Sequence, residues 1–124
     1  MIHFTTQHRL LLAVEPADFR KGIDSLAALC QQVLNEDPYT GAIFAFANRN
    51  KTAVKLLMFD TNGFWLALKR FSSGKLTWWP SEKNKTVPVR AEALQVLLSQ
   101  GDPRFMHVPS PWRNFTQPET ISEA

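Results

Sequence analysis

The chain has 124 residues, of which 44% are hydrophobic and 20% charged, with 9 Phe, 4 Trp and a formal net charge of +3. These totals predict one modest globular core and exclude a chain that is disordered throughout. The single cysteine excludes an intrachain disulfide, and no apolar run approaches the ~20 residues that cross a bilayer. The N-terminal stretch does not resemble a secretory signal, so we expect a cytoplasmic protein with no membrane partner.

The positive charge is concentrated in the middle of the chain. Residues 49–90 carry nine Lys or Arg side chains against two acidic ones, a net charge of +7. Residues 1–48 carry three cations against five acids. Such clustering is typical of proteins that bind nucleic acid.

The first elements predicted along the chain are a strand and a helix. Residues 9–14 form a short apolar run that ends at a Glu-Pro pair, which predicts a buried strand. Apolar residues then recur at helical spacing over 23–34, so we expect a helix with Cys30 on its buried face as a packing residue. Residues 35–41 contain a proline and a glycine that end this helix.

Strands are predicted next, at residues 42–48, 53–60 and 64–71. The second and third of these flank an Asn-Gly pair, which is a strong hairpin signal. A two-residue turn at Asn62-Gly63 would place Lys55 opposite Arg70 on the core face. Like charges directly opposite one another are destabilising, and either a bound anion or splaying into water would relieve them.

The last elements are a fourth strand of this group at 74–80, a polar lysine-bearing loop at 81–88 and a helix over 89–101. The element order predicts an α+β fold: a single domain over residues 1–100, with an antiparallel sheet of about four to five strands and two helices packed on one side of it. Residues 101–124 are rich in proline and are expected to form a flexible C-terminal tail, anchored by Phe105 or Trp112.

No set of residues suggests an enzyme. Neither a zinc ligand set nor a glycine-rich phosphate loop is present, so we predict no catalytic residues, no metal and no cofactor. Asp18, Asp24 and Asp60 are the carboxylates that a two-metal site would need. Simpler roles are available: Asp18 could cap a helix, Asp24 could be a favourable anion in a first helical turn, and Asp60 could be a turn residue.

Cations and aromatic residues form the better candidate site. The candidate nucleic-acid-binding residues are Arg20, Lys21, Arg49, Lys51, Lys55, Lys69, Arg70 and Lys75. Trp65, Trp78 and Trp79 lie in the same segment and could stack on bases. The alternatives are a rim of solvated lysines and tryptophans that belong to the core. Arg20 either extends a phosphate site at a helix N-terminus or forms an ion pair with Asp18 or Asp24.

A series of short motifs then resembles a known family. They are Asp18, Arg20, Gly22, Asp24, Leu26 and Ala27; Asp37, Pro38, Thr40 and Gly41; Phe44 and Phe46; residues 55–57 with Gly63; Lys69, Arg70 and Gly74; and Trp79-Pro80. In this order they resemble the TnpB-type accessory protein, the second open reading frame product, of the sixty-six group of bacterial insertion sequences. The match spans about residues 9–100, with Ser25 in place of the family's usual glycine and an extra tryptophan before the proline.

The resemblance implies a part in transposition, a form of DNA recombination, as a helper to a separate DDE transposase encoded by the same mobile element. It supplies no catalytic residues. The leading hypothesis is therefore a DNA-binding accessory protein whose basic face contacts element ends or non-specific duplex, alongside the transposase and the element's other accessory protein. The alternative is a protein-interaction adaptor that binds the transposase or its small partner without contacting DNA.

Overall fold

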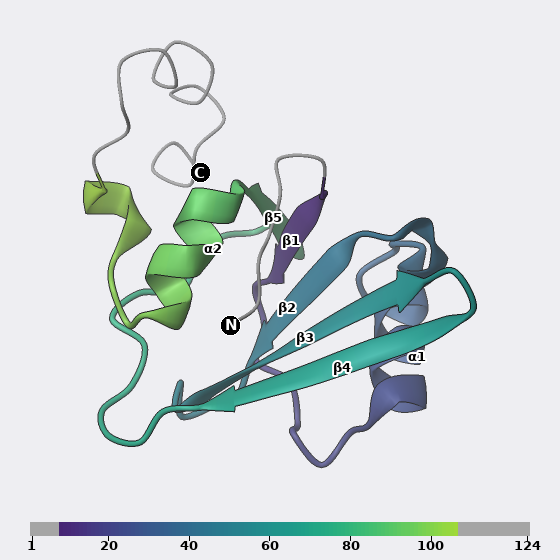
Figure 1. The fold of residues 1–124 in the computed structure, drawn as a ribbon, viewed down its shortest axis with the longest axis horizontal. Helices are drawn as coiled ribbons and strands as arrows, with labels where there is room; N and C mark the ends of the chain where they lie inside the picture. The colour runs from purple at the N-terminus through teal and green to yellow at the C-terminus, as the bar shows by residue number, and fades with distance from the viewer. Residues whose placement is uncertain (1–7, 107–124) are drawn as a thin grey trace, which may run out of the picture.

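The computed structural model describes residues 8–106. Its elements are β1 (Leu10–Ala13), α1 (Ile23–Gln32), β2 (Ile43–Ala47), β3 (Ala53–Asp60), β4 (Gly63–Arg70), β5 (Thr86–Val89) and α2 (Ala91–Leu98), with short 3₁₀ helices η1 (Pro38–Thr40) and η2 (Pro103–Phe105). The strands form one five-stranded sheet in the order β4-β3-β2-β1-β5 (Figure 1). The α+β class and the sheet with two helices are thereby confirmed.

The sheet is mixed, which corrects the expectation of a purely antiparallel one. β1 pairs with β2 in parallel, and the other three neighbouring pairs are antiparallel. Parallel neighbours need a crossover connection, and α1 supplies it between β1 and β2.

The two helices cover opposite faces of the sheet, so the prediction that both lie on one side is wrong. Leu26, Cys30 and Phe44 belong to the core under α1, whereas Leu12 and Leu94 belong to the core under α2. Every residue of β1 and of β2 is buried. Successive strand residues point to opposite faces, so a strand that is apolar throughout needs a helix on each side.

The β3–β4 hairpin forms with a register two residues away from the predicted one. Asp60 pairs with Gly63, so Thr61 and Asn62 make the turn, and Thr61 takes a left-handed φ of 53°. Lys55 therefore lies opposite Leu68, and the predicted Lys55–Arg70 pair does not exist. A slip of two residues keeps each side chain on its predicted face.

The fifth strand is β5 and not the predicted strand at 74–80. Residues 74–80 run as a connector that buries Leu76 and Trp79, while Val87 and Val89 alternate inward from β5. The predicted loop at 81–88 therefore supplies most of this strand. Pro88 is tolerated because β5 lies at the edge of the sheet.

The chain after α2 turns back onto the core. Pro103 is buried and Met106 packs against the core under α2, whereas Phe105 is 81% exposed and is not an anchor. Trp112, the other proposed anchor, lies outside the described residues.

Candidate nucleic-acid interface

One end of the sheet gathers most of the lysine and arginine side chains. β1, β2 and β4 finish at this end, and β3 and β5 begin there (lower left in Figure 1). The cations in the segments that meet here are Arg20, Lys21, Arg49, Lys51, Lys69, Arg70, Lys75, Lys83 and Lys85, which we call the basic end. Glu15, Asp18, Asp24 and Glu82 are the acids in the same segments and in the first turn of α1 that follows them. The basic end therefore has a surplus of positive charge.

The opposite end of the sheet has the reverse balance. Arg9 and Arg90 lie beside the strand ends there, together with Glu36, Asp37, Asp60 and Glu92. Arg9 is bridged to Glu36 at 3.5 Å and Arg90 to Glu92 at 3.3 Å. The described part of the chain is thus polarised along its strands.

A polar groove opens at the basic end between two segments that are far apart in sequence. It has a volume of about 420 Å³ and is lined by Pro16, Ala17, Asp18, Phe19, Arg20, Asn48, Arg49 and Asn50. The two segments are joined by a backbone hydrogen bond from the Ala17 N–H to the Ala47 carbonyl, at 2.9 Å. Arg20 and Arg49 therefore line the same groove although 29 positions separate them.

Asp18 and Arg20 form a compact ion pair on one wall of this groove. The Arg20 guanidinium donates through Nε and Nη2 to both carboxylate oxygens, at distances of 2.7–3.1 Å, and the Arg20 backbone N–H donates to Oδ1 at 2.9 Å. These hydrogen bonds hold the pKa of Asp18 well below its usual range and raise that of Arg20. The Arg20 side chain is 91% exposed, so the pair orients its guanidinium and leaves it open to solvent.

The other wall is the turn between β2 and β3, which Asn48 organises. Its side-chain oxygen accepts the backbone N–H groups of Thr52 and Ala53, and its amide donates to the Thr52 hydroxyl. Lys51 takes the left-handed φ of 64° that closes this turn. The turn presents Arg49 as an exposed residue.

Lys55 is buried beneath the groove rather than exposed on it. Its side chain is among the buried charged residues, and Nζ donates to the carbonyls of Phe19 and Lys21, at 2.8 Å each. The ammonium also lies 5.0 Å from the Phe19 ring centroid. Lys55 thus fastens the 19–21 segment to β3. Its role is therefore to hold two other predicted site residues, Arg20 and Lys21, in place.

The remaining predicted cations lie around the end of β4. Lys69 and Arg70 are the last residues of the strand, and both are exposed. Lys69 Nζ donates to the Leu98 carbonyl at the end of α2, at 2.8 Å. The Leu76 N–H donates to the Lys51 carbonyl, which brings Lys75 to the same turn.

The three tryptophans of the predicted site, all within residues 8–106, do not form a common stacking surface. Trp79 is buried and donates its indole N–H to the Ala13 carbonyl at 2.9 Å, so it belongs to the core. Trp78 is half-buried beneath Arg104, whose guanidinium carbon lies 5.3 Å from the ring. Trp65 is 65% exposed but lies near the β3–β4 turn, where it donates to Asp60.

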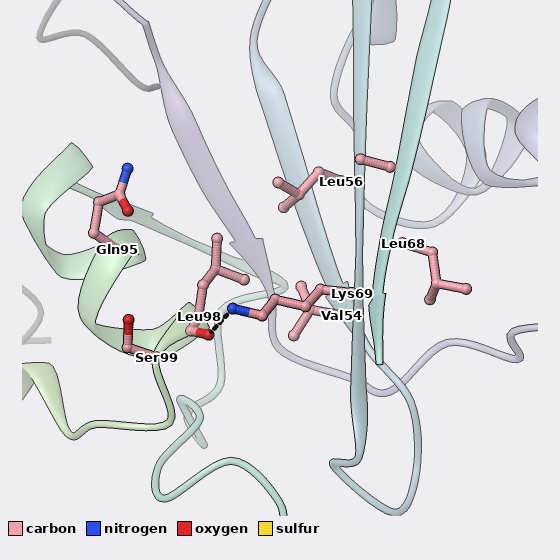
Figure 2. Close-up of a pocket in the computed structure, with 8 residues that line it drawn as sticks. Val54, Leu56, Leu68, Lys69, Gln95, Leu98 and Ser99 are labelled. Carbon is pink, nitrogen blue, oxygen red and sulfur yellow. Dashed lines mark hydrogen bonds between the residues drawn. The ribbon is translucent and has the colours of Figure 1, made fainter. Parts of the chain in front are cut away.

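A second, mostly apolar pocket lies between the β3–β4 hairpin and the end of α2. It has a volume of about 310 Å³ and is lined by Val54, Leu56, Ala67, Leu68, Lys69, Gln95, Leu98 and Ser99. Figure 2 shows Lys69 crossing this space to the Leu98 carbonyl, while Leu68 points away from the other labelled residues. No sequence motif indicated this pocket, because β4 and α2 meet only in the folded chain.

Lys83 and Lys85 belong to the basic end, although sequence analysis did not name them as candidates. They lie in the loop that leads into β5, and Thr86 pairs with Ala13 at the end of β1. A correct assignment of residues 86–89 as a strand would have placed both lysines at this end of the sheet. The charge count over residues 49–90 already contained the signal.

The three aspartates considered for a metal site, and the single cysteine, lie in positions with ordinary structural roles. Asp24 occupies the first turn of α1, Asp60 accepts hydrogen bonds from Thr61 and Trp65, and no group of three or more metal-binding side chains is found within residues 8–106. The α1 N-cap is Gly22 without a side-chain cap, so the suggested capping role of Asp18 is wrong. Burial raises the pKa of the Cys30 thiol to about 12, consistent with a packing role. None of the helices described is long and apolar enough to cross a membrane.

Comparison with known proteins identifies the family of this chain. A model of the IS66 Orf2-like protein family matches residues 8–107. The chain belongs to this family of insertion-sequence accessory proteins. The resemblance that the sequence motifs indicated is thereby confirmed.

Two relatives from Sinorhizobium fredii (strain NBRC 101917 / NGR234) are similar to the chain. Uncharacterized protein y4jC is 32% identical over 91 residues, covering 73% of this chain and 77% of the relative. Uncharacterized protein y4hO is 33% identical over 105 residues, covering 85% and 89%. No solved structure matches the chain.

Proposed function

We propose that this protein is a non-catalytic accessory factor in transposition, which acts in the bacterial cytoplasm and binds DNA through its basic end. It would help a separate DDE transposase of the same element to hold element-end DNA. The observation that carries the proposal is the concentration of cations from four separate segments of the chain at one end of the sheet.

The geometry of the basic end suits a phosphate backbone better than a small ligand. Arg20 and Arg49 flank an open polar groove, and Lys69, Arg70 and Lys75 continue the positive charge beyond it. Phosphate contacts of this kind release counterions, so they give affinity that falls with salt and depends little on sequence. We therefore expect similar affinity for element-end and random duplex.

The test is fluorescence anisotropy of the purified chain with an element-end duplex and a random duplex at about 50 and 200 mM salt. The variant Arg49→Gln/Arg70→Gln should weaken binding to both duplexes at least about tenfold at the lower salt. It should also reduce the slope of log K against log salt by about 2, because two phosphate contacts are lost.

The matched control is Arg9→Gln/Arg90→Gln, which removes the same charge from the opposite end of the sheet. We expect it to change affinity less than about threefold, since screened charges far from the contact contribute little. Equal losses in the two variants would contradict a localised site, and the absence of salt-dependent binding by the parent chain would refute the proposal.

A second comparison addresses Arg20. Asp18→Ala removes the carboxylate that engages the Arg20 guanidinium, so we expect tighter DNA binding, whereas Arg20→Gln should weaken it.

A separate experiment tests the adaptor alternative: co-purification with the transposase is measured before and after nuclease treatment. An association that survives nuclease, together with no DNA affinity, would replace the proposal by the adaptor role.

A further inference from the structure

The open edge of the sheet is β4, and its residues are unusually apolar for an exposed strand. β4 is the outermost strand of the sheet beyond β3, so its other side pairs with no strand of the described residues. Trp65 is 65% exposed and Leu68 is 58% exposed. An exposed edge strand that carries apolar residues is a template for pairing with another strand, and proteins usually protect it.

The register of the hairpin identifies the free backbone groups. In an antiparallel pair, residues alternate between hydrogen-bonded and non-hydrogen-bonded positions. The Phe71 N–H donates to the Thr52 carbonyl, so Phe71 occupies a hydrogen-bonded position. By alternation, the backbone N–H and C=O groups of Lys69, Ala67, Trp65 and Gly63 also point toward β3. The N–H and C=O groups that point outward therefore belong to Phe64, Leu66, Leu68 and Arg70.

The other edge of the sheet is blocked. The Val14 N–H donates to the Lys85 carbonyl, so the same alternation turns residues 86 and 88 of β5 outward. Residue 88 is a proline, which has no N–H to offer to a further strand. The two edges thus differ: β5 carries a proline at an outward-facing position, whereas β4 has no proline and its charged residues, Lys69 and Arg70, lie only at its end.

We propose that β4 pairs antiparallel with β4 of a second copy of this chain, about a two-fold axis at Ala67. In this register Leu66 faces Leu68 of the second copy and Phe64 faces Arg70, so every outward-facing residue finds a partner. Trp65 faces Lys69 on the other side of the sheet. Each cation meets an aromatic ring and no like charges face one another, which makes the strand complementary to itself.

The same register explains the apolar pocket beside α2. Ala67 and Lys69 line that pocket from β4. Trp65 of the second copy lies opposite Lys69, so its indole ring stands at the mouth of the pocket. Pairing would therefore cover an exposed tryptophan and an apolar hollow at once. This inference does not depend on DNA binding.

The first test is a cross-link at the two-fold axis, with Ala67→Cys in the full-length chain. At a non-hydrogen-bonded antiparallel pair the two Cα atoms lie about 4.5 Å apart, which suits a disulfide. We expect a covalent dimer under mild oxidation, and none from the parent chain, whose Cys30 is buried. Cross-linking of Leu68→Cys in preference to Ala67→Cys would overturn the register.

The second test measures the molar mass by light scattering from about 5 to 500 µM, where a reversible dimer shows concentration dependence. Leu68→Pro removes an N–H that points outward and leaves the pairing with β3 intact, so we expect it to raise the dimer dissociation constant at least about tenfold. The control is Val33→Lys, which replaces another exposed apolar residue and should leave the mass unchanged. A parent chain that stays monomeric throughout would refute the proposal.

Discussion

Replacement of Lys55 by methionine should destabilise the domain strongly, although lysine is ordinarily a surface residue. The Lys55 ammonium donates to the carbonyls of Phe19 and Lys21, at 2.8 Å each, from a side chain that is 9% exposed. Methionine keeps the length and the apolar stem of the side chain but donates no hydrogen bond. Both carbonyls would lose this donor.

The size of the effect follows from these two contacts. A hydrogen bond from a charged donor contributes about 1.5–3 kcal/mol, so two of them contribute about 3–6 kcal/mol. Methionine recovers part of this because no ammonium has to be taken out of water. We therefore expect Lys55→Met to lower the free energy of unfolding by about 2–4 kcal/mol, a large share of the ~5–15 kcal/mol typical of a domain.

Urea unfolding followed by circular dichroism measures this loss, and thermal unfolding should show a fall of at least about 8 °C for a domain of this size. Lys75→Met is the control, because Lys75 is exposed, and it should change the free energy of unfolding by less than about 0.5 kcal/mol. If Lys55→Met is as stable as the parent within that margin, the two hydrogen bonds do not hold the 19–21 segment and our account of Lys55 is wrong.

Three further changes test the cores. Gly101→Ala should cost about 1–3 kcal/mol in thermal unfolding, because a Cβ there would lie 2.8 Å from Val96 Cγ1; a neutral result would mean that the end of α2 shifts freely. Trp79→Phe should cost about 1–2 kcal/mol in urea unfolding by removing the donor to the Ala13 carbonyl, and no loss would contradict that hydrogen bond. Cys30 has a pKa raised from 9.0 to about 12, so above pH 9 the unfolded chain releases a thiol proton that the folded chain retains, and stability falls as pH rises. Cys30→Ala should show a shallower decline between pH 9 and about 10.5, and an identical slope would refute the raised pKa.

The elements with one strong local signal were predictable from the sequence. The apolar run at β1, the helical spacing of α1 and the apolar segment of β2 all lie in the sequence itself, and the structure places them within two residues of their predicted bounds. Both β5 and the hairpin register were missed for local reasons. The polar residues and lysines of 81–88 favoured a loop where β5 begins. The Asn-Gly pair placed the predicted turn one residue beyond the observed turn at Thr61-Asn62.

The arrangement of the candidate site depended on contacts that no local pattern encodes. Lys55 bonds to carbonyls 34 and 36 positions earlier in the chain, so nothing near it in sequence indicated a buried role. Arg20 and Arg49 share a groove because β1 and β2 run parallel and end together. Composition predicted the presence of a basic surface, but only the strand order could show which cations it contains.

Pro88 has a consequence beyond β5 itself. A sheet with two open edges can add copies at both, and such growth has no natural end, which is how fibres form. Here the proline closes one edge, so an assembly through β4 is complete once two chains have met. A single imino acid in a four-residue strand would thus separate a finite particle from an open-ended polymer.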